Sequence, residues 1–194
     1  MRSILVFVFS ACSLFSFSQG YKDSMNLYIK NYVQNHEVVK GDDKKKMRFF
    51  PVDEKYRLVA QFQAAKNNQW FEMPTSGKLK KVFRLYGTLT FKVNDTVVHM
   101  NLYQSQGLMG SEEYKNYLFL PFTDLTTGVD TYESGRYIDL QISDVKNNQV
   151  VVDFNKAYNP YCAYISGVYN CPIPPRENHL PVAILAGEKS FDGH

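Results

Sequence analysis

A chain of 194 residues is the size of one domain with a real hydrophobic core, and an apolar fraction of 44% with 21% charged residues excludes a disordered chain. The formal charge of +3 is too small to indicate a nucleic-acid partner, so we expect none. The 14 Phe and 14 Tyr residues favour pleated, half-buried surfaces and therefore β-strands.

Residues 1–18 have the pattern of a signal peptide: a positive charge at Arg2, then an apolar stretch too short to span a membrane. Small residues stand at the two positions that signal peptidase reads, so we expect cleavage before Gln19. The mature protein, residues 19–194, is then a single domain without a transmembrane helix, exported to the periplasm or the cell exterior. The alternative is a lipoprotein signal that places a lipid anchor on Cys12.

Residues 21–36 are predicted to form the chain's one amphipathic helix. Apolar side chains recur there at the i, i+3, i+4, i+7 and i+8 spacing of a single helical face. These side chains are Met25, Tyr28, Ile29, Tyr32 and Val33.

From Phe49 onward the apolar period changes to two, which is typical of strands. Gly87, near the middle of the longest strand, indicates a bend or bulge. The predicted strands cover residues 56–63, 70–73, 82–93, 96–103, 117–122, 137–142, 150–154 and 180–186. Because strands and helices do not alternate, we predict a mainly β protein, an antiparallel barrel or sandwich of about seven or eight strands.

A long irregular segment, residues 153–189, is expected to complete the domain, because it holds five of the eight prolines and two of the three cysteines. Such a segment needs many hydrogen bonds from side chains to the backbone, which Asn155, Asn159 and Asn178 are suited to supply. Its tyrosines, Tyr158 among them, offer flat apolar area with a polar tip and are candidates to line a pocket.

Three runs of this segment resemble the signature of a large bacterial family catalogued only as a domain of unknown function. They are DFNKAYNPYCAY (153–164), YNCPIPPREN (169–178) and LPVAILAGEK (180–189). Residues 49–62 and 118–140 match the pattern of the same family in the same order, so the resemblance covers most of the mature chain. It implies no activity, because none is established for the family.

Cys162 and Cys171 are nine residues apart, and in an oxidising compartment they favour a disulfide worth about 2.5–3 kcal/mol. The resemblance argues against it, because some similar proteins lack export signals and a structural disulfide does not persist in a reducing cytosol. One alternative is a pair of buried or reactive thiols. Another is a nucleophilic pair of Cys162 or Cys171 with His179 as its base. A zinc site with His179 lacks the usual close ligand pair, so we expect no metal.

Alternation along the strand near residue 138 puts Tyr137 and Asp139 on one face and Arg136 on the other. Asp153 and Asn155 likewise share a face. If the two strands are neighbours, Arg136 pairs with Asp153 or binds an anionic group in a bidentate manner. We favour a purely structural role, in which Arg136 forms a bridge to a carboxylate and holds the polar loops together.

The sequence thus favours an exported, non-enzymatic protein that binds an unknown small molecule or cell-envelope component. With no nucleophile elbow, phosphate loop or cofactor fingerprint, we expect no cofactor. The candidate ligand-binding residues are Arg136, Tyr137, Asp139, Asp153, Asn155, Tyr158, Asn159, Cys162, Glu177 and Asn178. The alternative is a hydrolase-like enzyme that uses Arg136, Asp139, Asp153, Cys162 or Glu177. If these groups meet in one open cleft, the enzyme is favoured. If they are buried against one another, they serve to hold the fold together.

Overall fold

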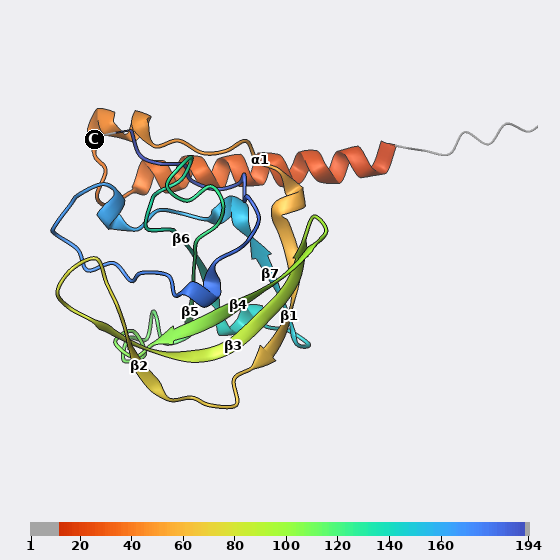
Figure 1. Cartoon of the computed structure of the whole chain (residues 1–194). Coiled ribbons are helices and arrows are strands. Elements are labelled where there is room, and N and C mark those ends of the chain that lie inside the picture. Colours follow the sequence, from red (N-terminus) through yellow and green to blue (C-terminus); the bar gives the residue numbers. More distant parts are fainter. Residues whose placement is uncertain (1–11, 193–194) are drawn as a thin grey trace, which may run out of the picture.

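The computed structural model describes residues 12–192, with side chains from residue 19 onward. Residues 1–11 of the predicted signal peptide lie outside the described residues. Within the described part, one α-helix precedes seven strands joined by turns and short 3₁₀ segments (Figure 1). The elements are α1 (Cys12–Asn35), β1 (Arg57–Ala64), β2 (Trp70–Met73), β3 (Lys81–Val93), β4 (Thr96–Ser105), β5 (Tyr117–Phe122), β6 (Arg136–Gln141) and β7 (Gln149–Asp153).

The strands form one antiparallel sheet in the order β6-β5-β4-β3-β1-β7, with β2 added to β3. The sheet curls into a half-barrel, so the two edge strands face each other across a groove of about 350 Å³. Ile138 of β6 and Val151 of β7 line this groove. The predicted mainly β architecture with one N-terminal helix is therefore confirmed.

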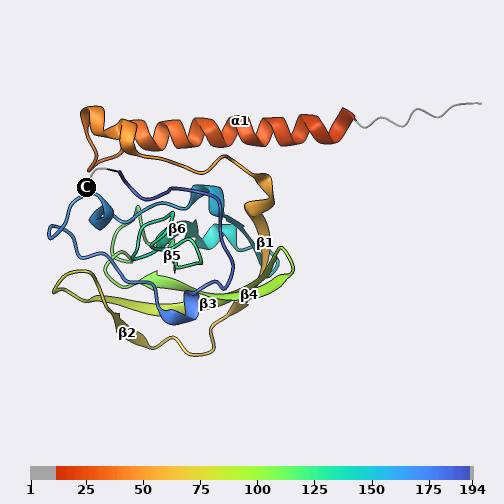
Figure 2. The ribbon, with the colours of Figure 1, turned by 45° about the horizontal axis from the view of Figure 1, so that its top comes forward.

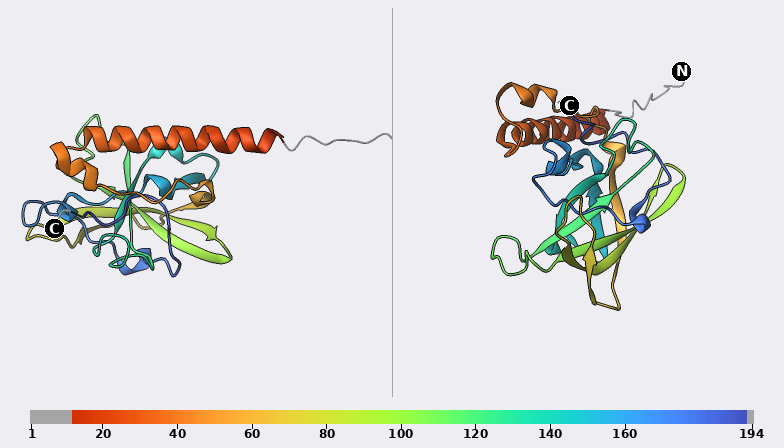
Figure 3. Two further views of the ribbon diagram at one scale, coloured as in Figure 1. Left: turned by 90° about the horizontal axis from the view of Figure 1, so that it is seen from above. Right: turned by 60° about the vertical axis from the view of Figure 1, so that its left-hand side comes forward.

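Helix α1 contains the predicted amphipathic stretch and also extends back to Cys12. In Figures 2 and 3 it lies outside the sheet along one side of the domain, and its first turns extend beyond the domain. Met25 is buried, while Tyr32 and Val33 pack against a small cluster that includes Tyr164. This apolar face holds α1 against the C-terminal segment.

Because of a bulge in β3, the two halves of this strand contribute side chains to two different hydrophobic clusters. The register with β4 shifts between Leu85 and Gly87, which inserts one extra residue and reverses the faces of the strand. Before the bulge, Phe83 packs with the aromatic side chains of β5 and β6; after it, Leu89 and Phe91 enter the main core. The bulge predicted at Gly87 is confirmed, and a side chain at that position would overlap the Phe62 ring.

The strand predicted at residues 180–186 is wrong. These residues contain no strand, because their backbone groups bond to loops and side chains instead of to a neighbouring strand. The Leu180 N–H donates to the Thr123 carbonyl at 2.8 Å, and the Ile184 N–H donates to the Asp124 carboxylate at 3.0 Å. Leu180 and Ile184 are fully buried in the main core, which explains the apolar pattern that suggested a strand.

Candidate functional site

A cavity of about 470 Å³ lies between α1, β6, the start of β3 and the C-terminal segment. We call it the tyrosine cavity, because six tyrosines line it. They are Tyr28, Tyr32, Tyr137, Tyr158, Tyr161 and Tyr169. Two of the six come from the helix and four from positions more than a hundred residues later, so the cavity exists only because α1 packs against the C-terminal segment.

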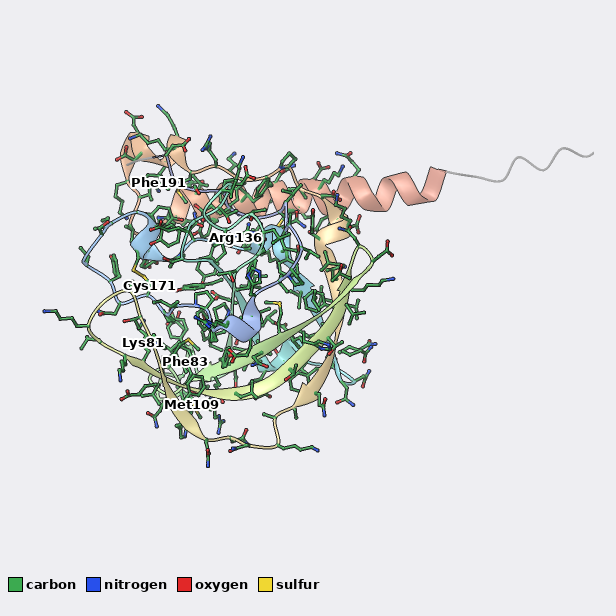
Figure 4. The ribbon with its side chains drawn as sticks, viewed as in Figure 1. Lys81, Phe83, Met109, Arg136, Cys171 and Phe191 are labelled. Carbon is green, nitrogen blue, oxygen red and sulfur yellow. A yellow bond between two sulfur atoms is a disulfide. The ribbon has the colours of Figure 1, made fainter. Side chains whose placement is uncertain are left out.

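A second cavity of about 560 Å³ adjoins the tyrosine cavity and shares Lys81, Tyr137, Tyr158 and Pro172 with it. It extends over the aromatic cluster around Phe83. In Figure 4, Lys81 and Phe83 lie on the same side of the domain as Cys171, which also lines the tyrosine cavity. The two cavities therefore form one hollowed region on the face of the sheet opposite the main core.

The tyrosine rings stand at steep angles to one another instead of stacking. Tyr137 and Tyr158 have ring centroids 5.8 Å apart and planes at 90°. Tyr32 meets Tyr158 at 6.2 Å and 47°, and Tyr161 meets Tyr169 at 5.1 Å and 62°. At these angles neighbouring tyrosine rings contact one another edge to face or tilted, and together they line the cavity.

Most of the tyrosine hydroxyls are already hydrogen-bonded within the walls. The Tyr158 hydroxyl donates to Asp139 Oδ1 at 2.7 Å, and the Tyr161 hydroxyl donates to Glu37 Oε2 at 2.9 Å. The Tyr137 hydroxyl donates to the Pro172 carbonyl. Burial raises the pKa of each of these phenols, so they stay neutral donors at physiological pH.

Asp139 supplies a carboxylate to the wall. Its Oδ1 accepts from Tyr158 and also from the Tyr117 hydroxyl at 2.8 Å. The residue is solvent-exposed, and it borders both the tyrosine cavity and the groove between β6 and β7. Burial raises the pKa of Asp139 and outweighs the two tyrosine hydrogen bonds, which lower it. Among the described side chains, Asp139 forms no ion pair.

Two basic side chains also line the cavity. Burial lowers the pKa of Lys81, and no carboxylate in the part of the chain that the structure describes lies within ion-pair distance of it. His36 is buried, and its Nδ1 accepts from the Val39 N–H at 2.9 Å. Burial, with the positive charges of Lys44 and Lys40, lowers the pKa of His36 to about 4, so it is neutral at pH 7.

Arg136 lies away from the cavity and pairs with Asp124, not with Asp153. Both side chains are almost completely buried, with Nη2 and Oδ2 3.0 Å apart. The guanidinium also donates to the carbonyls of Ile184, Ala186 and Glu188. The predicted pairing with Asp153 is wrong because β6 and β7 are the opposite edges of the sheet. Arg136 does form a structural ion pair, but its partner is Asp124, which the alternation pattern did not indicate.

Asp153 and Asn155 are buried, and both form hydrogen bonds with Tyr21 of α1. The Tyr21 hydroxyl lies 2.9 Å from both oxygens of the Asp153 carboxylate. Asn155 Nδ2 donates to that hydroxyl at 3.0 Å and to the Asp53 carbonyl at 2.9 Å. Asp153 and Asn155 thus lie side by side as predicted, and their hydrogen bonds join the helix, the loop before β1 and the end of β7.

Asn178 and Asn159 hold backbone within the fold. Asn178 Nδ2 donates to the carbonyls of Asn101 at 2.9 Å and Pro121 at 2.7 Å, so it bridges β4 and β5 beside their one registered pair. Asn159 Nδ2 donates to the Lys189 carbonyl at 2.8 Å. Glu177 is exposed and lines none of the cavities described above.

Cys162 and Cys171 form a disulfide, with their Cα atoms 6.2 Å apart. This agrees with the predicted small loop and leaves no free thiol for a Cys–His pair. His179 instead lies 3.0 Å from the Thr123 hydroxyl. No cluster of three or more potential metal ligands occurs in residues 12–192.

Glu188 is a buried charged residue that the sequence patterns did not indicate. It is fully buried, and its carboxylate accepts from the Tyr164 hydroxyl at 2.7 Å and the Asn159 N–H at 2.9 Å. Burial raises the pKa of Glu188 to about 7, opposed by these bonds and by the charge of Arg136. Lys81 and the helix tyrosines were missed as well. A possible signal was the helix face itself, where Tyr28, Tyr32 and His36 recur every fourth residue.

Comparisons with known proteins find a structure with a similar fold and a matching family, but they indicate no activity. A solution NMR structure of an uncharacterized protein from Haloarcula marismortui has a TM-score of 0.66 and 24% identity, covering 92% of this chain and 99% of that chain. A search of the curated proteins found no match. No helix in the described residues is long and apolar enough to cross a membrane. A family profile matches residues 43–189, and the chain therefore belongs to the family described as Protein of unknown function (DUF1684).

Proposed function

We propose that this protein binds a small organic ligand, or the corresponding group of a cell-envelope component, in the tyrosine cavity. The observation that carries the proposal is a cavity of about 470 Å³ walled by six tyrosines, with the Asp139 carboxylate in its wall. Ligand sites in proteins are typically concave and largely aromatic or apolar, with a few polar groups that orient the ligand. This cavity has that composition and a size suited to a small molecule.

Binding is favoured over hydrolysis because the polar groups needed for a hydrolase do not meet. Asp139 is the one of the five hydrolase candidates that lines the tyrosine cavity. Arg136 and Asp153 are buried in contacts that join parts of the fold, and Cys162 is in the disulfide. Acid–base or nucleophilic catalysis requires its groups within hydrogen-bond reach of one reacting centre.

The first test is binding of p-cresol and indole, two neutral aromatic probes, followed by amide chemical shifts. We expect shifts concentrated in β6 and residues 158–172. Tyr28→Ala removes one wall and should weaken binding about tenfold, as expected for the loss of an aromatic contact. The matched control is Leu27→Ala, since Leu27 is 58% exposed on the neighbouring helix position and does not line the cavity. Equal effects of the two substitutions, or shifts scattered over the surface, would contradict the proposal.

We further propose that the protein is exported, with residues 1–18 removed before Gln19. The disulfide supports this, because disulfides persist in oxidising compartments. Tyr21 and Tyr32, two helix side chains that contact the domain, lie after this cleavage point and remain in the mature chain. The intact mass of the protein from its native host should correspond to a chain that starts at Gln19 with one disulfide. A chain starting at a lipidated Cys12, or at Met1, would refute cleavage by the ordinary signal peptidase.

A further inference from the structure

We infer that the ligand of the tyrosine cavity is an organic cation, with an ammonium or quaternary ammonium group held next to Asp139 and among the tyrosine rings. The inference rests on the proposed function and adds the chemical class of the ligand. It combines two independent features of the cavity, the charge of its wall and the arrangement of its rings.

The charge argument starts from the partners of Asp139. Its two hydrogen bonds come from neutral phenols and both reach Oδ1, whereas Oδ2 accepts none from the described residues. Of the two buried aspartates of this sheet region, Asp124 is paired with Arg136 at 3.0 Å, whereas Asp153 accepts hydrogen bonds from Tyr21 and Asn155 at both of its oxygens. A carboxylate that has lost part of its water needs either hydrogen bonds to both oxygens or a cation to offset that loss. Among the described residues Asp139 has hydrogen bonds at one oxygen and no ion pair, so a bound cation would complete the site.

With Asp139 included, the charged side chains that line the cavity give it a net negative charge. Glu37 also lines the cavity and accepts from the Tyr161 hydroxyl at 2.9 Å. Among the side chains that line the cavity Lys81 is the one cation, because His36 is neutral at pH 7. Outside the cavity, Lys156 Nζ lies 5.4 Å from the centroid of the Tyr28 ring, and Lys156 lines the groove that Asp139 also borders. Lys81 also lines the second cavity, on the side away from the helix. A cation is therefore favoured near Asp139 and disfavoured towards Lys81.

The ring argument concerns what surrounds that cation. Tyr137 and Tyr158 meet at 90°, and Tyr32 is inclined to Tyr158 at 47°, so three rings of different orientation line the cavity that Asp139 also lines. The negative face of an aromatic ring attracts a cation, and boxes of several rings are the usual means of binding quaternary ammonium groups. Because the hydroxyls of Tyr137 and Tyr158 are bonded within the wall, mainly their rings remain for a ligand.

The test compares choline with 3,3-dimethylbutan-1-ol, which has the same shape but carbon in place of the charged nitrogen. By calorimetry, we expect choline to bind the native protein about tenfold more tightly. Asp139→Asn keeps an acceptor for both tyrosines and should abolish this preference. Asp95→Asn removes an equivalent charge from the exposed turn between β3 and β4 and should leave the preference intact. Lys81→Gln should strengthen choline binding several-fold, because it removes the opposing cation.

A second readout needs no substitution. Choline affinity should rise with increasing pH as Asp139 loses its proton, while affinity for the neutral alcohol stays constant. Equal affinities for choline and the alcohol, with shifts in the cavity, would overturn the inference and leave the proposed function standing. Failure of choline, the alcohol, p-cresol and indole to bind would overturn both. A choline preference that survives in Asp139→Asn and does not change with pH would also overturn the inference.

Discussion

Arg136→Met should lower the free energy of unfolding by about 3–5 kcal/mol, the usual cost of breaking a buried ion pair by removing one partner. The substitution leaves the Asp124 carboxylate uncompensated, with a side chain that is 0% exposed. It also removes the donors to the carbonyls of Ile184, Ala186 and Glu188, which have no strand to pair with. Urea unfolding followed by circular dichroism measures the change.

Two comparisons make this test specific to the buried pair. Arg176→Met removes an exposed arginine and should change stability by no more than about 0.5 kcal/mol. The double variant Arg136→Met with Asp124→Asn should lose less stability than the sum of the two single variants, because the unpaired charge is then absent. A loss below about 1 kcal/mol for Arg136→Met would mean that the C-terminal segment is held by other contacts.

Glu188→Gln should change the pH dependence of stability. Burial raises the pKa of Glu188 from 4.5 to about 7, so the folded protein holds this proton more tightly than the unfolded chain does. Its contribution is therefore fully present below about pH 4.5 and is lost as the pH rises through 7. The loss is about 3 kcal/mol, since each pKa unit corresponds to about 1.4 kcal/mol.

The measurement is urea unfolding of the native protein and of Glu188→Gln from pH 4.5 to pH 8. Over that range the stability of the variant relative to the native protein should rise by about 3 kcal/mol, because glutamine does not titrate. Glu177→Gln is the matched control: Glu177 is exposed, so its substitution should leave the native pH profile unchanged. A constant difference between Glu188→Gln and the native protein at every pH would contradict the raised pKa of Glu188.

Local patterns were sufficient for most of the elements. The period of two and the turn residues located β1 to β7 to within one or two residues, and the apolar stripe located the helix. The faces of β6 were also predictable: Tyr137 and Asp139 line the cavity, while Arg136 points into the protein towards Asp124. These features depend on the geometry of a few consecutive residues, which the order of side chains reveals directly.

The partners of those residues depended on the order of the strands. Arg136 pairs with Asp124 because β6 and β7 lie at opposite edges of the curled sheet, which no local pattern indicates. The same limit produced the false strand at residues 180–186, where burial in the core imitates the apolar pattern of sheet pairing. The tyrosine cavity joins Tyr28 and Tyr32 to residues more than a hundred positions away. Contacts over such distances are set by how the whole chain closes on itself, and so are the burial and the raised pKa of Glu188.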